Sequence, residues 1–170
     1  NTWNVSLITD MSNCFMFKTG FNSDISNWDV SNVTNMYRMF YYAQSFDCNG
    51  VDMNWNVSNV KNMEEMFRTA KVFNRDISKW NVSNVTTMKH MFYDAEKFDP
   101  SGNTINTQSV TVGDSTYNAW DVSNVEDMSY MFSYTENFNQ DLNDWDVSNV
   151  TTMEQMFRFA EVFNGNITNW

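Results

Sequence analysis

The sequence predicts a right-handed α/β solenoid of six coils, each about 25 residues long, with one short parallel strand and one short helix per coil. Two observations predict it: a fixed repeat of Trp, and an apolar pattern that recurs at the same offsets from every Trp. The Trp residues are Trp3, Trp28, Trp55, Trp80, Trp120, Trp145 and Trp170, with spacings of 25, 27, 25, 40, 25 and 25. Such a period is the signature of stacked repeats, in which each unit covers the apolar face of its neighbour.

The short helix is predicted at positions +8 to +15, counted from the Trp that opens each unit. Met or Cys, Phe and mostly Ala occupy +8, +11, +12 and +15, as in Met36, Met39, Phe40 and Ala43. This is the i, i+3, i+4, i+7 spacing of one helical face. Asp, Asn or Thr stands at +7, where a side-chain oxygen can cap the first turn.

The short strand is predicted around each Trp, as in residues 77–82, because Trp and the Val at +2 share one face of an extended segment. We expect one domain over residues 1–170, with units that start at Trp3, Trp28, Trp55, Trp80, Trp120 and Trp145. An extra 15 residues lie within 99–119, around the only Pro, Pro100, and the alternating run 109–112, and predict a hairpin or loop at one edge.

Composition excludes some classes of partner. The net charge of −11 argues against nucleic acid, because phosphate binding needs clustered Lys and Arg. No apolar run approaches the roughly 18 residues of a membrane span, so no membrane insertion is expected within this segment. The chain begins at Asn1 without an initiator Met, and we therefore expect a processed chain or an excised segment.

The string W-D-V-S-N-V-T-x-M-x-x-M-F-x-x-A-x-x-F-N-x-D-I-S-x-W resembles the bacterial surface protein repeat of the BspA-like family, a leucine-rich-repeat-like domain of unknown function. Residues 28–46, 80–98 and 145–163 carry it almost without departure. The resemblance implies an extracellular or cell-surface protein with a role in adhesion, and it supplies no catalytic residues. Departures lie at Leu7, Lys18 and Thr135, where the repeat has Asn, Ala and Ala.

Function is expected where the units differ, because packing explains the positions that repeat. Positions +9, +10, +13 and +14 vary strongly, and exposed Tyr and Arg are common anchors of binding surfaces. The candidate ligand-binding residues are Tyr37, Tyr41, Tyr42, Tyr93, Tyr130 and Tyr134. A solvated face with scattered aromatic side chains is the alternative interpretation.

No metal site, cofactor or catalytic group is predicted. Asp24, Asp76 and Asp141 recur in one column. Asp29, Asp121 and Asp146 recur in another, together with Asn4, Asn56 and Asn81. Such columns would suit Ca²⁺, but Asn ladders can form there without metal. His90 is the single His, and we expect it to be solvated. Cys14 takes the place of a core Met, which favours a buried thiol.

We therefore expect a non-enzymatic extracellular scaffold that binds a protein or glycan on another surface, through the variable face and the 99–119 insertion. The alternative is a structural subunit that associates end to end into a filament. Neither end of the stack carries a polar cap, and heterologous contacts that do not close produce fibres.

Overall fold

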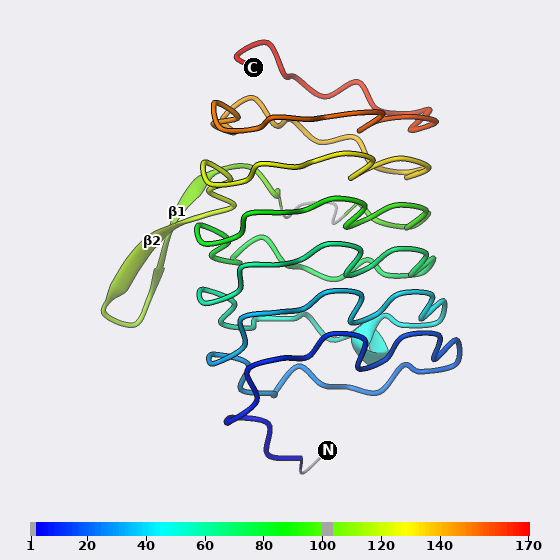
Figure 1. Cartoon of the computed structure of the whole chain (residues 1–170), viewed down its shortest axis with the longest axis vertical. Helices are drawn as coiled ribbons and strands as arrows, with labels where there is room; N and C mark the ends of the chain where they lie inside the picture. The colour runs from blue at the N-terminus through cyan, green and yellow to red at the C-terminus, as the bar shows by residue number, and fades with distance from the viewer. Residues whose placement is uncertain (1–2, 100–103) are drawn as a thin grey trace.

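The molecule is a stack of backbone coils, seen here in a computed structural model that describes residues 3–99 and 104–170. The two termini lie at opposite ends of the stack, and a hairpin projects from its side (Figure 1). The assigned elements are the 3-10 helix η1 (Cys48–Gly50) and the strands β1 (Gln108–Val112) and β2 (Ser115–Ala119).

The predicted α/β solenoid, with a helix and a parallel strand in each coil, is wrong. The described residues contain no α-helix, and the one sheet among them is the antiparallel pair β1–β2. Turns replace both the expected helices at +8 to +15 and the expected strands around Trp. Parallel pairing is confined to isolated bridges between the +7 residues of successive units, Asp10, Asn35, Asn62, Thr87, Asp127 and Thr152.

Left-handed residues explain why no helix forms. In every unit the residues at +10 and +14 have positive φ, as at Arg38 (53°) and Tyr42 (56°). An L-residue in this conformation reverses the chain after one turn, because the right-handed geometry cannot continue through it. The amide of Ala43 accordingly donates to the carbonyl of Phe40 at 2.9 Å, three residues back, in a turn.

The amides between these turns point along the stack. Arg38 N–H donates to Glu64 O at 3.0 Å, and Phe40 N–H donates to Met66 O at 2.9 Å. Amides at +8, +10, +12 and +14 make the same bonds in each of the first five units, always to the following unit. Backbone groups that a helix would satisfy internally are thus satisfied by the next coil, which offsets the cost of about 1–2 kcal/mol for each left-handed residue.

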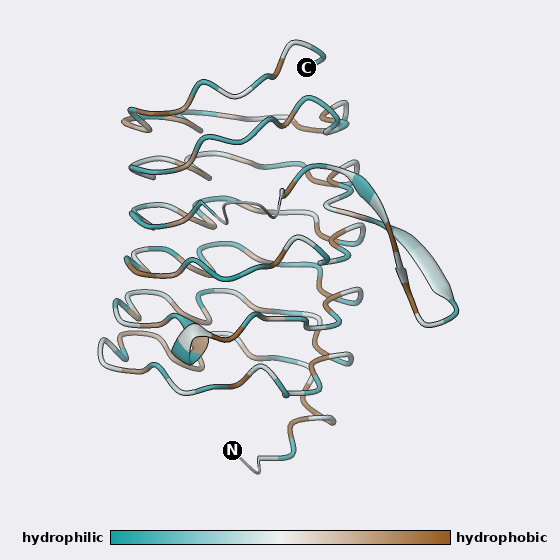
Figure 2. Cartoon of the chain, turned by 180° about the vertical axis from the view of Figure 1, so that it is seen from behind, coloured by the Kyte–Doolittle hydropathy of each residue, from teal (hydrophilic) through white to brown (hydrophobic). Residues whose placement is uncertain are grey.

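The core consists of ring columns that run through the stack. Phe40 lies 5.4 Å from Phe67 in the next coil and 3.9 Å from Phe46 in its own, with nearly parallel planes. Met36, Met39 and Ala43 are fully buried beside these rings. Apolar residues recur at equivalent places of successive coils (Figure 2).

Side-chain ladders hold the coils in register. The Asn at +4 donates to the Ser carbonyl of the preceding unit, as from Asn59 Nδ2 to Ser31 O at 2.7 Å. Trp indoles also donate to main-chain carbonyls of the preceding coil, as from Trp55 Nε1 to Ile25 O at 3.1 Å. In the first unit Leu7 replaces the Asn and its side chain is exposed.

The insertion forms the β1–β2 hairpin, which pairs Gln108 with Ala119 and Val112 with Ser115. Residues 100–103 of the 99–119 segment, Pro100 included, lie outside the described residues. Cys14 is exposed, so the expectation that it is buried is wrong, and both Cys14 and Cys48 are free thiols. Across the described ranges, no helix has the length and hydropathy of a membrane span.

Candidate functional site

The structure brings the six predicted Tyr residues into one continuous surface. They come from positions +9, +10, +13 and +14, so stacking of the coils aligns them along the axis. Ring contacts join them to further aromatic and cationic side chains. We call this surface the aromatic ribbon: Phe17, Tyr37, Arg38, Tyr41, Tyr42, Arg68, His90, Tyr93, Tyr130, Tyr134, Arg158 and Phe159.

The first half of the ribbon is a cluster of three rings with Arg on it. Phe17 of the first unit lies edge-on to Tyr41 at 5.3 Å and 5.6 Å from Tyr42. The guanidinium of Arg38 lies 5.0 Å from the Tyr41 ring centre, and that of Arg68 lies 5.6 Å from it on the next coil. Tyr41 therefore contacts guanidinium groups from two successive units.

The second half continues the surface through the fourth, fifth and sixth units. Arg68 also covers Tyr93 at 4.6 Å, and Tyr93 contacts Tyr134 at 5.4 Å. Tyr134 contacts Phe159 at 4.8 Å. Phe17 and Phe159 at the two ends are 57% and 52% exposed, so the ribbon presents apolar ring surface to solvent.

A buried carboxylate fixes the Arg side chains. Glu65 is 4% exposed and accepts hydrogen bonds from Arg38 Nη2 at 2.8 Å and from Arg68 Nη1 at 3.2 Å. The hydrogen bond to Glu65 raises the pKa of Arg38 above the ordinary value of an Arg side chain. Buried charges need such pairing, and the pair holds both guanidinium planes against the rings, where cation–π contacts are worth about 0.5–2 kcal/mol.

His90 is part of the ribbon, so the expectation of a solvated side chain is wrong. Its ring stacks on Tyr130 at 4.8 Å with a 9° angle and meets Tyr93 edge-on at 5.4 Å. Burial of the imidazole, followed by the nearby charge of Arg68, lowers the pKa of His90. The imidazole is therefore neutral at pH 7 and acts as another aromatic surface.

The Asp columns have a local structural role. Asp29 Oδ1 accepts from the amide of Ser31 at 3.1 Å and from its hydroxyl at 2.6 Å, and Asp146 Oδ1 accepts from the amide of Ser148 at 3.0 Å. These are Asx turns, in which the side chain replaces a backbone acceptor. Within the described ranges no group of three or more His, Cys, Asp or Glu side chains is arranged to hold a metal ion.

Sequence reasoning left several ribbon residues out of the candidate site. Phe17 and Phe159 stand at +14, the same offset as Tyr42 and Tyr134, so the column register could have identified them. Arg68 carries no sequence signal for bridging Tyr41 and Tyr93, because that contact depends on how the coils stack. What the ribbon offers chemically is flat, rigid aromatic surface beside fixed cations, which suits binding.

Comparison with known proteins gives a family and no closer relative. Neither the curated proteins nor the solved structures contain a significant match to the chain. A family model matches three successive stretches, residues 1–54, 49–119 and 112–170, and its description is Mycoplasma protein of unknown function, DUF285. Because these matches span the chain, this protein belongs to that repeat family.

Proposed function

We propose that this chain is a non-catalytic cell-surface interaction module that binds a protein or glycan ligand on another surface through the aromatic ribbon. The proposal rests on one observation. Tyr and Arg side chains from five coils align into one exposed surface, in which ring contacts and cation–π contacts join successive coils. Tyr and Arg dominate binding energy at interfaces, since they offer large contact area with little freedom to lose. The likeness to BspA-like, leucine-rich-repeat-like surface repeats agrees with an extracellular role in adhesion.

Pre-organisation supports this function. The Tyr41 ring contacts the guanidinium groups of Arg38 and Arg68, and the carboxylate of Glu65 forms an ion pair with both cations. A ligand that lies along the ribbon would therefore meet side chains that are already ordered. Binding to such a surface loses less conformational entropy than binding to mobile side chains.

The test is to probe glycan arrays and cell-surface protein arrays with the purified chain and with a Tyr42→Ser/Tyr134→Ser variant. Both Tyr residues are at the exposed edge of the ribbon. We expect a bound ligand whose affinity falls by about tenfold or more in the variant. A Val72→Ser/Val162→Ser variant, which removes two exposed apolar residues outside the ribbon, serves as the control. Ligands that bind all three proteins equally would contradict the proposal.

End-to-end association is the second candidate function, and the polarity of the coils favours it. In the sixth unit the amides of Met153, Gln155, Phe157 and Phe159 donate to no described residue. In the first unit the carbonyls of Asp10, Ser12, Cys14 and Met16 accept from none. This row of amides and this row of carbonyls stand at the same offsets as the groups that bond between internal coils. The side-chain bond from the Asn at +4 would be missing from such a contact, because Leu7 takes the place of that Asn.

Light scattering over a concentration series tests this alternative. End-to-end association predicts a molar mass that grows with concentration. A Trp3→Lys variant should reduce that growth, because Trp3 is 69% exposed at the end of the indole column. A constant monomer mass at every concentration would reject the alternative for this segment.

A further inference from the structure

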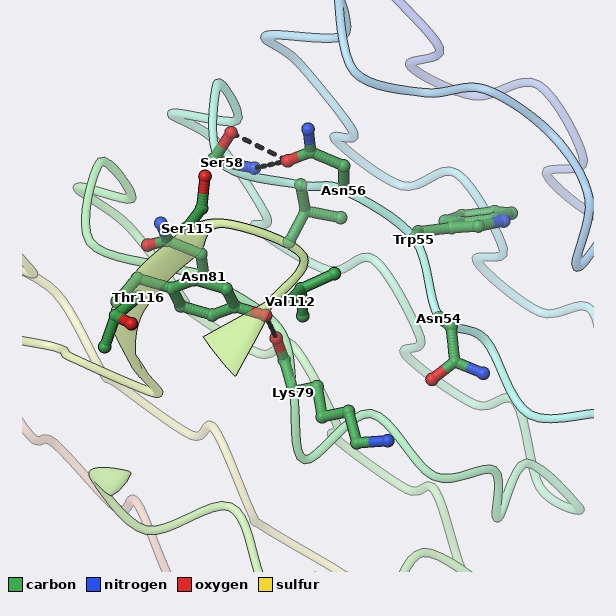
Figure 3. Close-up of a pocket in the computed structure, with 11 residues that line it drawn as sticks. Asn54, Trp55, Asn56, Ser58, Lys79, Asn81, Val112, Ser115 and Thr116 are labelled. Atoms are coloured by element: carbon green, nitrogen blue, oxygen red, sulfur yellow. Dashed lines mark hydrogen bonds between the residues drawn. The ribbon is translucent and has the colours of Figure 1, made fainter. Parts of the chain in front are cut away.

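A second site lies apart from the aromatic ribbon, between the β1–β2 hairpin and the third and fourth coils. It is a pocket of about 670 Å³, within the ~300–1,000 Å³ range typical of small-molecule sites. Figure 3 shows hairpin residues such as Val112 and Thr116 on one side and coil residues such as Asn56 and Trp55 on the other. The full lining is Asn54, Trp55, Asn56, Val57, Ser58, Lys79, Asn81, Val112, Ser115, Thr116 and Tyr117.

The pocket is preformed because the hairpin is tied to the stack. Tyr117 Oη donates to the carbonyl of Lys79 at 2.6 Å. At the base of the hairpin, Thr107 Oγ1 donates to Trp120 O at 3.0 Å and Gln108 Nε2 donates to Ser78 O at 3.3 Å. A ligand would therefore not have to order the loop that covers it.

The charge of the pocket is the reverse of the charge of the molecule. The chain carries a net charge of −11, yet Lys79 is the one charged residue in the lining. Asp114, at the hairpin turn, is not part of it. No carboxylate among the described residues pairs with Lys79.

The +1 column is neutral where it lines the pocket. This column carries Asp29, Asp121 and Asp146 in three units and Asn in the other three, of which Asn56 and Asn81 line the pocket and Asn4 lies away from it. Both residues perform the same turn-forming task as Asp, since Asn56 Oδ1 accepts from Ser58 and Asn81 Oδ1 accepts from Ser83. The turn therefore forms with Asp as well as with Asn. With Asn at both positions, the pocket carries two fewer negative charges than it would with Asp.

The donors that remain are suited to an anion. Because each Oδ1 is occupied by its own turn, the Nδ2 groups of Asn56 and Asn81 remain as donors, and neither bonds to another described residue. Lys79 supplies the cation of the lining, and its side chain and the two Asn side chains lie at different edges of the pocket (Figure 3). Ser115 and Thr116 add hydroxyl groups, and Val112, which is 56% exposed, adds apolar surface with Tyr117.

We propose that this pocket binds an acidic saccharide, a sugar that carries a carboxylate, with Lys79 contacting the carboxylate and the Asn amides donating to other oxygens of the sugar. The hydroxyl side chains match the sugar hydroxyls, which both donate and accept, and the apolar wall matches the C–H face of the ring. This site lies on another surface and shares no residue with the aromatic ribbon. It adds to the proposed binding function and does not depend on it.

The test is isothermal titration calorimetry with two matched pairs of sugars: cellobiouronic acid beside cellobiose, and digalacturonic acid beside galactobiose. We expect one acid to bind at least about tenfold more tightly than its neutral partner, with an affinity that falls as NaCl is added. Lys79→Asn and Asn81→Asp should each remove that preference. Both substitutions introduce a residue that the repeat already has in the same column, at Asn27 and Asp121, so the fold should be retained.

An Asp146→Asn variant makes the reverse exchange in the same column away from the pocket, and should bind like the unchanged protein. The ribbon variant Tyr42→Ser/Tyr134→Ser should also bind both acids normally, which separates this proposal from the ribbon. Equal affinity for acid and neutral sugar, unchanged binding by Lys79→Asn, or no binding of either acid at millimolar concentration would overturn the proposal.

Discussion

At the scale of the residue, an Asx turn recurs in every unit, in which the side chain at +1 accepts from the amide at +3. The hydrogen bond from the Ser31 hydroxyl, and then that from its amide, lowers the pKa of Asp29, and Ser148 lowers the pKa of Asp146 in the same way. Asp10 and Asp24 have lowered pKa values for the same reason, through Ser12 and Ser26. A carboxylate that accepts two bonds from one Ser is best satisfied when ionised.

Acid should therefore weaken the molecule in a defined range. A group whose pKa is depressed on folding contributes stability that is present above its unfolded pKa, about 3.9 for Asp, and is lost as pH falls through the folded pKa. We expect the melting temperature to drop steadily below about pH 4. In an Asp29→Asn/Asp146→Asn variant the drop should be smaller, because Asn accepts the same bonds without titrating. Circular dichroism melts at pH 2 to 5 would measure both, and identical slopes would contradict the assignment.

His90 gives a second pH effect, at higher pH. Its pKa is lowered on folding, so the unfolded chain takes up a proton first as pH falls through about 6.5. We expect stability to decrease between about pH 7 and pH 5. A His90→Asn variant, with a residue that tolerates positive φ, should show a flatter profile over that range. Because this is the single His, an unchanged slope in the variant would disprove the half-buried, neutral imidazole.

At the scale of the element, the apolar spacing in each unit is compatible with two structures. Met36, Met39, Phe40 and Ala43 point into the core as the sequence predicts, but consecutive four-residue turns place these offsets inward as well as a helix does. The choice between the two depends on bonds to the next coil, which no single unit reveals. Prediction of the site from the sequence was limited in the same way. The repeat alone aligns the six Tyr residues. The Arg38–Glu65–Arg68 bridge and the pocket beside Tyr117 depend on contacts between segments far apart in the sequence, which the repeat does not reveal.

Gln155 can distinguish the observed turns from a helix. It is exposed at a +10 position with a φ of 52°. Gln155→Gly should stabilise the protein by about 1 kcal/mol, because Gly adopts positive φ without strain. In a helix the same change would cost about 1 kcal/mol. Gln155→Val should destabilise, since a β-branched residue suits this conformation least. Urea unfolding of the three proteins decides, and a less stable Gly variant would contradict the turn geometry.

At the scale of the whole molecule, stability depends on the continuity of the ring columns. Phe67 is fully buried, 5.4 Å from Phe40, 5.7 Å from Phe92 and 4.0 Å from Phe73. Its ring therefore contacts rings of three successive coils, its own included, and its loss leaves a cavity beside all three.

Phe67→Ala should cost about 3–5 kcal/mol, a large part of the stability of a typical domain. Val72→Ala, which trims an exposed side chain of the same unit, should change stability by less than about 0.5 kcal/mol. Chemical unfolding followed by Trp fluorescence would compare them. A Phe67 variant as stable as the Val72 variant would show that the coils do not share one core.

The prevailing direction of the inter-coil amide bonds has an electrical consequence. Four peptide N–H groups in each of the first five coils point toward the following coil. Fewer point back: those at +6, as from Thr34 to Thr9, and those of Ser45, Lys97 and Trp120. Peptide dipoles that align in this way sum along an axis. The described stack therefore carries partial positive charge at its C-terminal coil and partial negative charge at its N-terminal coil, the opposite sense to an α-helix. An applied electric field would therefore orient the molecule through this backbone dipole as well as through the charges of its ionised side chains.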